Sequence, residues 1–248
     1  MRVLALVLAV STAAFAQQER QPMEAGKVDS APMIEAANVN FRYTRDLSVL
    51  IHAMRGRLVP ASGHHIPDFN HPDSFVIATD AAEISMSTTQ LAAMMNDYML
   101  SAPDAEIKNV SLKVEDDKLH IHGTMKKGIH VPFDAVATPS LTEDNRIRFT
   151  VSEMKGAKIP MKGIMDKFGG LEKLISSKGL KGLSVEQDSL LVDAQTALPP
   201  PQLRAKITGV HLRGDALVIV VGSGAPKLDS KRPKNYMAIR GGNIRYGR

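Results

Sequence analysis

The chain has 248 residues, a formal net charge of +5 and no cysteine. This length is enough for one large domain or two small ones, and the missing cysteines exclude disulfides, thiolate zinc sites and thiol catalysis. Tryptophan is absent and other aromatic residues are scarce, which argues against stacking platforms for bases. We therefore expect no nucleic-acid partner.

The first 16 residues have the form of a secretory signal peptide. Arg2 gives a positive start, residues 3–10 are apolar, and Ala14-Phe15-Ala16 is a small-x-small cleavage signal. No other stretch approaches the roughly 18–20 apolar residues of a membrane helix. The sequence predicts a periplasmic or secreted protein, cleaved after Ala16, with a flexible polar leader over residues 17–38.

Strand patterns begin at residue 39. Apolar residues stand at Val39, Phe41, Tyr43, Leu47, Val49 and Ile51, and polar ones fill most positions between them. This alternation predicts one half-buried strand, or two strands that turn near Arg45-Asp46. A loop rich in Pro, His and Asp follows over residues 60–73, and a further strand begins at Phe75.

Two amphipathic helices are predicted. Ser87 and Gln90 form a capping box at the start of the first, and its apolar stripe comprises Leu91, Met94, Met95, Tyr98 and Met99. The second helix covers residues 161–176, and its apolar face includes Ile164, Met165 and Phe168. Both stripes need an apolar partner. Methionine also suits surfaces that accommodate variable apolar ligands, although ordinary core packing explains it equally simply.

An internal repeat is the most informative feature of the sequence. The pattern apolar-x-apolar, x-x, Asp, x, Leu, x, apolar occurs over residues 112–121, 183–192 and 210–219. Each copy predicts a strand, a tight turn and a returning strand. Two more alternating stretches meet at a turn over Glu143-Asp144-Asn145. The pattern indicates an antiparallel meander with one apolar face.

These elements predict an α+β fold: a curved antiparallel meander wrapped around amphipathic helices, over residues 39–222. Residues 223–248 form a basic segment in which residues 236–246 resemble one more hairpin. That hairpin has no obvious partner, which would fit a truncated form of a longer protein. The positive charges suit contact with anionic lipid headgroups, and a solvated end is the alternative.

Two groups of histidines are candidate metal ligands. A three-residue turn at Lys126-Lys127-Gly128 would set His120 opposite Asp134 and Thr124 opposite His130. Neutral imidazoles on one sheet face can bind zinc; the ligands would be His120, His122, His130 and Asp134. A second group, with spacing that permits a metal, comprises His64, His65, Asp68 and His71. The alternative for both groups is an ordinary polar surface.

No motif requires an enzyme. The sequence contains no nucleophile elbow, zincin helix or phosphate-binding loop, so we assign no catalytic residue and no cofactor. Acidic pairs such as Glu143-Asp144 fall in predicted turns, where acidic residues favour turn formation.

The order of the elements resembles the bacterial branch of the tubular lipid-binding proteins. The resemblance covers about residues 84–221 and is carried by Val110-x-Leu112, Leu119-x-Ile121-x-Gly123, Val131-x-Phe133 and Ile159-Pro160-Met161. It implies an apolar groove for acyl chains, lined by the two helix stripes: Leu91, Met94, Met95, Tyr98, Met99, Ile164, Met165 and Phe168. The expected function is lipid binding or transfer. The alternatives are a scaffolding envelope protein and a metal-dependent lipid hydrolase.

Overall fold

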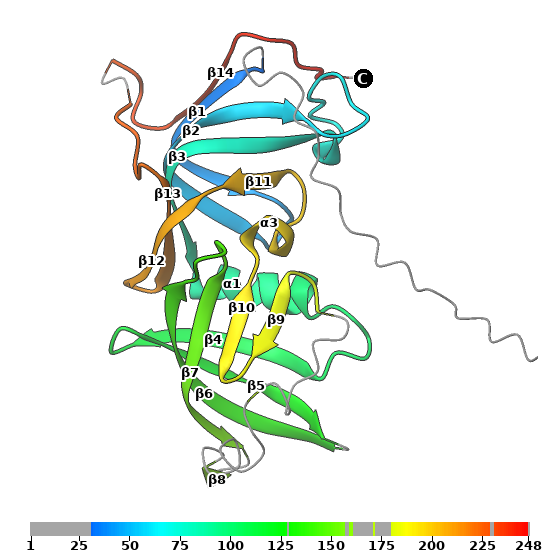
Figure 1. Ribbon diagram of the computed structural model, residues 1–248, viewed down its shortest axis with the longest axis vertical. Helices are drawn as coiled ribbons and strands as arrows, with labels where there is room; N and C mark the ends of the chain where they lie inside the picture. The colour runs from blue at the N-terminus through cyan, green and yellow to red at the C-terminus, as the bar shows by residue number, and fades with distance from the viewer. Residues whose placement is uncertain are drawn as a thin grey trace, which may run out of the picture.

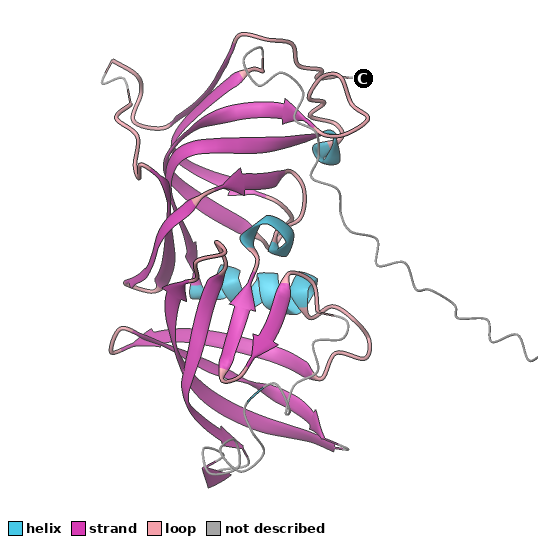
Figure 2. Ribbon diagram, in the orientation of Figure 1, coloured by secondary structure: helices cyan, strands magenta, loops and turns pink. Residues whose placement is uncertain are grey.

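The computed structural model describes residues 31–127, 129–156, 159–160, 171, 180–228 and 231–247. In this part the chain is mostly β-strand and forms two seven-stranded sheets. Figure 1 shows one sheet in the upper half and the other in the lower half, with helix α1 (Thr88–Met94) crossing between them. Figure 2 shows how little of the described chain is helical. The predicted α+β fold, with a meander wrapped around amphipathic helices, is therefore wrong.

The first sheet combines strands from both ends of the described chain. Its order is β12-β13-β3-β2-β1-β14, with β11 added in parallel to β3. The strands are β1 (Met33–Arg42), β2 (Ser48–Pro60), β3 (Phe75–Ser87), β11 (Gln202–Ala205), β12 (Ile207–Arg213), β13 (Ala216–Gly222) and β14 (Tyr236–Arg240). The predicted pair of strands turning near Arg45-Asp46 is confirmed as β1 and β2, but β1 begins six residues before the expected start.

The basic segment belongs to this sheet. Strand β14 pairs with β1, with Met33 opposite Arg240 and Ala37 opposite Tyr236. The predicted hairpin over residues 236–246 is therefore wrong, because β14 pairs with a strand about 200 residues earlier and not with its own continuation.

The second sheet is contiguous in sequence. Its order is β4-β5-β6-β7-β10-β9, and β8 pairs with β7. The strands are β4 (Ile107–Glu115), β5 (Lys118–Lys127), β6 (Ile129–Leu141), β7 (Ile147–Gly156), β8 (Ile159–Pro160), β9 (Leu183–Glu186) and β10 (Ser189–Val192). The predicted turn between β6 and β7 is confirmed, with Leu141 opposite Ile147.

All three repeat copies form hairpins with two-residue turns, as predicted. The closing pairs are Glu115 with Lys118, Glu186 with Ser189 and Arg213 with Ala216. The turns contain residues with positive φ, namely Asp116 (50°), Asp117 (55°), Gln187 (50°) and Gly214 (57°). Such left-handed positions match the twist of the flanking strands. The first two hairpins lie in the second sheet and the third lies in the first.

Helix α1 has the predicted N-cap, since the hydroxyl of Ser87 accepts from the backbone N–H of Gln90 (3.3 Å). The side chain of Gln90 does not complete a capping box. Its Oε1 instead accepts from the backbone N–H of Ser48 (2.6 Å) in β2. The helix continues into a π-helical turn, η3 (Met95–Met99). Two short helical turns, η2 (Pro72–Ser74) and α3 (Ala194–Ala197), complete the described helices.

The predicted second helix, over residues 161–176, falls almost entirely outside the described residues, and Ile164, Met165 and Phe168 lie outside them. Among the helices that are described, none is long and apolar enough to cross a membrane.

Side-chain hydrogen bonds fix two turns of the molecule near α1. The carboxylate of Asp215, in the β12–β13 turn, accepts from the hydroxyl of Thr88 (2.8 Å) at the start of α1. Asn145, in the β6–β7 turn, donates to the carbonyl of Ala205 (2.9 Å) and accepts from the N–H of Ile207 (2.7 Å). The Asn145 bonds therefore fix a turn of the second sheet against β11 and β12 of the first.

Candidate functional site

An apolar pocket of about 160 Å³ lies on the inner face of the first sheet. The lining residues come from strands β1, β2, β3, β11 and β14, from the β1–β2 turn, from the loop before β3 and from the segment that leads into β11. They are Ile34, Phe41, Arg42, Tyr43, Val49, Ile51, Met54, Leu58, Phe69, Pro72, Phe75, Ile77, Ile84, Pro200, Pro201, Leu203 and Met237. Fifteen of the seventeen have apolar side chains that cannot form a hydrogen bond; the exceptions are Arg42 and Tyr43. The pocket is suited to an apolar guest.

Strand alternation explains why these residues gather. Phe41 pairs with Val49 across β1 and β2, and cross-strand partners face the same side of a sheet. The apolar alternation seen in the sequence over residues 39–51 therefore becomes one wall of the pocket. Phe69, in the loop, packs edge-to-face on Phe75 with ring centroids 5.4 Å apart and adds a wall from outside the sheet.

The two polar side chains of the lining are neighbours. Arg42 is the last residue of β1 and is exposed, whereas Tyr43 is half-buried. Tyr43 packs edge-to-face on Phe41, with ring centroids 4.9 Å apart. Burial raises the pKa of the Tyr43 hydroxyl, so the group stays neutral.

The C-terminal segment holds the loop that carries Phe69. The backbone N–H of Phe69 donates to the carbonyl of Arg245 (3.0 Å), and the N–H of Arg245 donates to the carbonyl of Pro67 (2.8 Å). Asp68 is buried, and the backbone N–H of Asn70 lowers its pKa, with further help from His71 and Arg245. The basic C-terminal segment is thus attached beside the pocket.

The groove predicted at the first helix is nearly closed. The space between α1, η3 and the second sheet has a volume of about 20 Å³, and its lining includes Leu91, Met94, Met95 and Met99. Leu91, Met94 and Met99 are buried, and Met95 and Tyr98 are partly buried. A space of that size holds about one water molecule, so within the described residues this stripe packs as core.

The histidine register differs from the prediction by two residues. His122 lies opposite Asp134, and Lys126 lies opposite His130. A two-residue slip keeps every side chain on its face, so the apolar pattern could not distinguish the two registers. His122 Nδ1 is 2.9 Å from Asp134 Oδ1. His120 and His122 border an open hollow of about 510 Å³ on the wet face of the second sheet. The side chain of His130 lies outside the described part.

Neither histidine group forms a metal centre within the described residues, where no three His, Asp or Glu side chains are placed to hold an ion. In the loop group His64 and His65 are exposed, and only His71 approaches Asp68, with Nδ1 3.3 Å from Oδ2.

Sequence reasoning missed a serine–histidine pair, because its members are 33 residues apart. His52 Nε2 lies 2.8 Å from the hydroxyl of Ser85, on strands β2 and β3. The guanidinium of Arg213 lies 3.3 Å from the same nitrogen and is also bonded to Glu83 (2.8 Å). Nucleophilic catalysis needs a base whose other nitrogen is oriented by a third group. Within the described residues no acid contacts Nδ1 of His52, so we interpret the pair as a link between strands.

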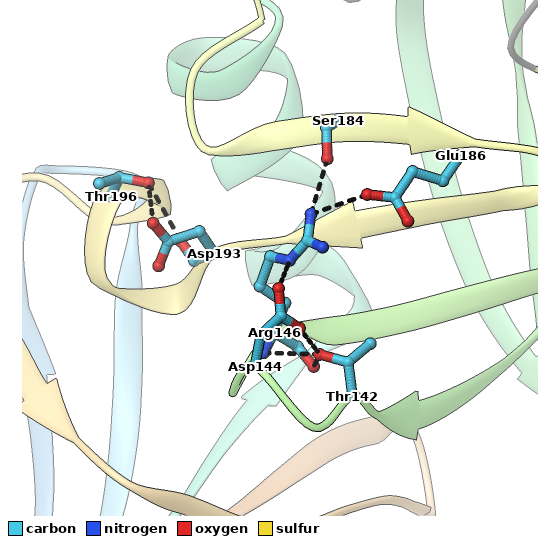
Figure 3. Close-up of polar contacts among 7 residues, drawn as sticks. All are labelled: Thr142, Asp144, Arg146, Ser184, Glu186, Asp193 and Thr196. Atoms are coloured by element: carbon cyan, nitrogen blue, oxygen red, sulfur yellow. Dashed lines mark hydrogen bonds and ion pairs between the residues drawn. The ribbon is translucent and has the colours of Figure 1, made fainter. Parts of the chain in front are cut away.

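Another polar cluster missed by the sequence surrounds Arg146 (Figure 3). Its guanidinium bonds to Asp144 (2.6 Å), Ser184 (3.3 Å) and Glu186 (3.1 Å). The Thr142 hydroxyl, with Arg146, lowers the pKa of Asp144. These groups use one another as hydrogen-bond and ion-pair partners, and they link the β6–β7 turn to β9. We therefore interpret the cluster as structural.

Comparisons with known proteins give no relative: no protein-family model, no curated protein and no solved structure matches the chain. The resemblance to the tubular lipid-binding proteins stays a prediction.

Proposed function

We propose that the protein binds a short apolar chain, or the apolar part of a larger amphiphile, in the pocket of the first sheet. One observation carries the proposal: a cavity of about 160 Å³ whose lining is almost wholly apolar. Apolar cavities of this size stay dry and take up small apolar molecules such as benzene. The lipid-binding function expected from the sequence is retained, but its site moves from α1 to the first sheet.

The volume limits the guest. A complete long acyl chain exceeds the space available, so the pocket suits a short chain or one end of a longer one. Each buried methylene contributes about 0.8 kcal/mol before the entropy of binding is subtracted. A short chain thus gives modest affinity, as expected for a protein that takes up and releases its ligand.

Octan-1-ol provides a direct test, because its chain is short and its headgroup is uncharged. Calorimetric titration of the mature chain should show saturable binding. The variant Val49→Phe places a ring in the pocket and should weaken binding at least about tenfold, since each displaced methylene removes ~0.8 kcal/mol.

The matched control is Val192→Phe. Val192 lines the small space beside α1, so this variant makes the same substitution in the other half and should leave octan-1-ol binding unchanged. Absence of binding by the wild-type chain would overturn the proposal and favour a scaffolding protein. Equal binding by wild type and Val49→Phe would place the site elsewhere.

A further inference from the structure

Among the residues that the structure describes, the pocket lining includes one charged residue, Arg42, and it has no ionic partner there. Three other arginines of the first sheet are paired within the protein: Arg55 and Arg240 both bind Glu35 (3.2 and 3.3 Å), and Arg213 binds Glu83 (2.8 Å). Among the described residues no carboxylate lies within ion-pair distance of Arg42. Its positive charge is therefore available to a ligand.

The position of Arg42 suits the head of an amphiphile. It ends β1, next to Phe41, and Ile34 of the same strand also lines the pocket. At a rise of ~3.3 Å per residue these two apolar residues lie roughly 23 Å apart along β1. A chain lying along β1 would thus have its headgroup at the exposed guanidinium.

We propose that Arg42 gives the pocket a preference for anionic amphiphiles, by binding the carboxylate or phosphate headgroup of a ligand whose chain occupies the apolar lining. This inference rests on the proposed function and names its ligand class. The guanidinium offers parallel N–H donors that match both headgroups. Tyr43, the next residue, adds a neutral hydroxyl, which has no hydrogen-bond partner among the described residues.

The test compares ligands that share a chain and differ in the headgroup. Octan-1-ol, octanoate and octyl phosphate are titrated into the mature chain at pH 7 and low ionic strength. An exposed ion pair contributes up to about fivefold in affinity, so octanoate or octyl phosphate should bind about fivefold more tightly than octan-1-ol. The preference should shrink as salt is added, and the preferred anion distinguishes a carboxylate from a phosphate source.

Two variants assign the preference to its residue. Arg42→Gln should abolish the preference, so that the variant binds octan-1-ol, octanoate and octyl phosphate with equal affinity. Arg45→Gln removes an exposed arginine from the same β1–β2 turn that does not line the pocket, and it should retain the wild-type preference.

Three outcomes would overturn the inference. Equal affinity of the wild type for alcohol and anions, or an unchanged preference in Arg42→Gln, would show that Arg42 does not read the headgroup, while the apolar pocket would stand. Failure of the wild type to bind any of the three ligands would remove the proposed function and the inference together.

Discussion

The two sheets have the same number of strands but enclose different interiors. In the second sheet, α1 and η3 fill the apolar face and leave about 20 Å³. In the first sheet, the described helices contribute only Pro72 of the short turn η2 to the pocket lining, and about 160 Å³ remains between the strands and two connecting segments. Apolar alternation is equally clear in both halves. Whether a curved sheet forms a core or a pocket therefore depends on what covers it.

Truncation of a methionine in each half should give the largest difference in unfolding free energy. Met99→Ala should lower the free energy of unfolding by about 2–5 kcal/mol, because Met99 is fully buried and the tight interior cannot collapse around the loss. Met237→Ala should lower it by less than about 1 kcal/mol, since this pocket residue is 42% exposed. Urea denaturation of both variants measures the contrast, and equal losses would contradict it.

Replacement of a valine by phenylalanine in each half should give a smaller difference in unfolding free energy. Val192→Phe overpacks the space beside α1 and should cost about 1–3 kcal/mol of unfolding free energy. Val49→Phe places its ring in the existing pocket and should cost less. Thermal unfolding of the two variants checks this order. A more severe loss for Val49→Phe would mean that the first interior is packed as tightly as the second.

Loss of the contact between the halves should have an intermediate effect. Asn145→Gly removes both bonds to β11 and β12 but tolerates the positive φ of 68° at this position. We expect a loss of about 1–3 kcal/mol in the free energy of unfolding. Asn40→Ala, at an exposed position of β1, is the control and should change stability little. An unchanged stability of Asn145→Gly would show that the two halves do not depend on this contact.

The smallest effect should be a pH dependence at the edge of the pocket. The folded state lowers the pKa of Asp68, so its contribution to stability is complete above the unfolded value of ~3.9 and is lost as pH falls through the lower folded value. The protection factors of the Phe69 and Arg245 amides in hydrogen exchange should therefore fall at acid pH. Asp68→Asn should remove this pH dependence, and an identical profile in the variant would exclude Asp68 as its origin.

Local features of the fold could be predicted from the sequence. The three hairpins, the turn before Ile147 and the Ser87 N-cap depend on residues close together in the chain, where turn chemistry and strand period act directly. The pairing of β14 with β1 could not be predicted, because no local pattern selects a partner about 200 residues away. The predicted β5–β6 register was wrong for a different reason, since two registers satisfied the same apolar alternation.

The candidate pocket lies elsewhere than the groove that the sequence predicted. The sequence indicated an apolar cavity and placed it beside the methionine stripe of α1, because an amphipathic helix shows its apolar face plainly. The observed pocket combines β1 and β2 with Phe69, Pro200 and Met237, which lie in segments far apart in sequence. Only the assembled topology brings these residues together.

Methionine methyl groups report on both halves in one spectrum. Met54 and Met237 line the first pocket, whereas Met94, Met95 and Met99 line the space beside α1. Titration of methyl-labelled protein with octanoate should shift the resonances of Met54 and Met237 and leave the other three unchanged. Shifts confined to Met94, Met95 and Met99, or no shift at saturating ligand, would contradict an apolar binding pocket in the first sheet.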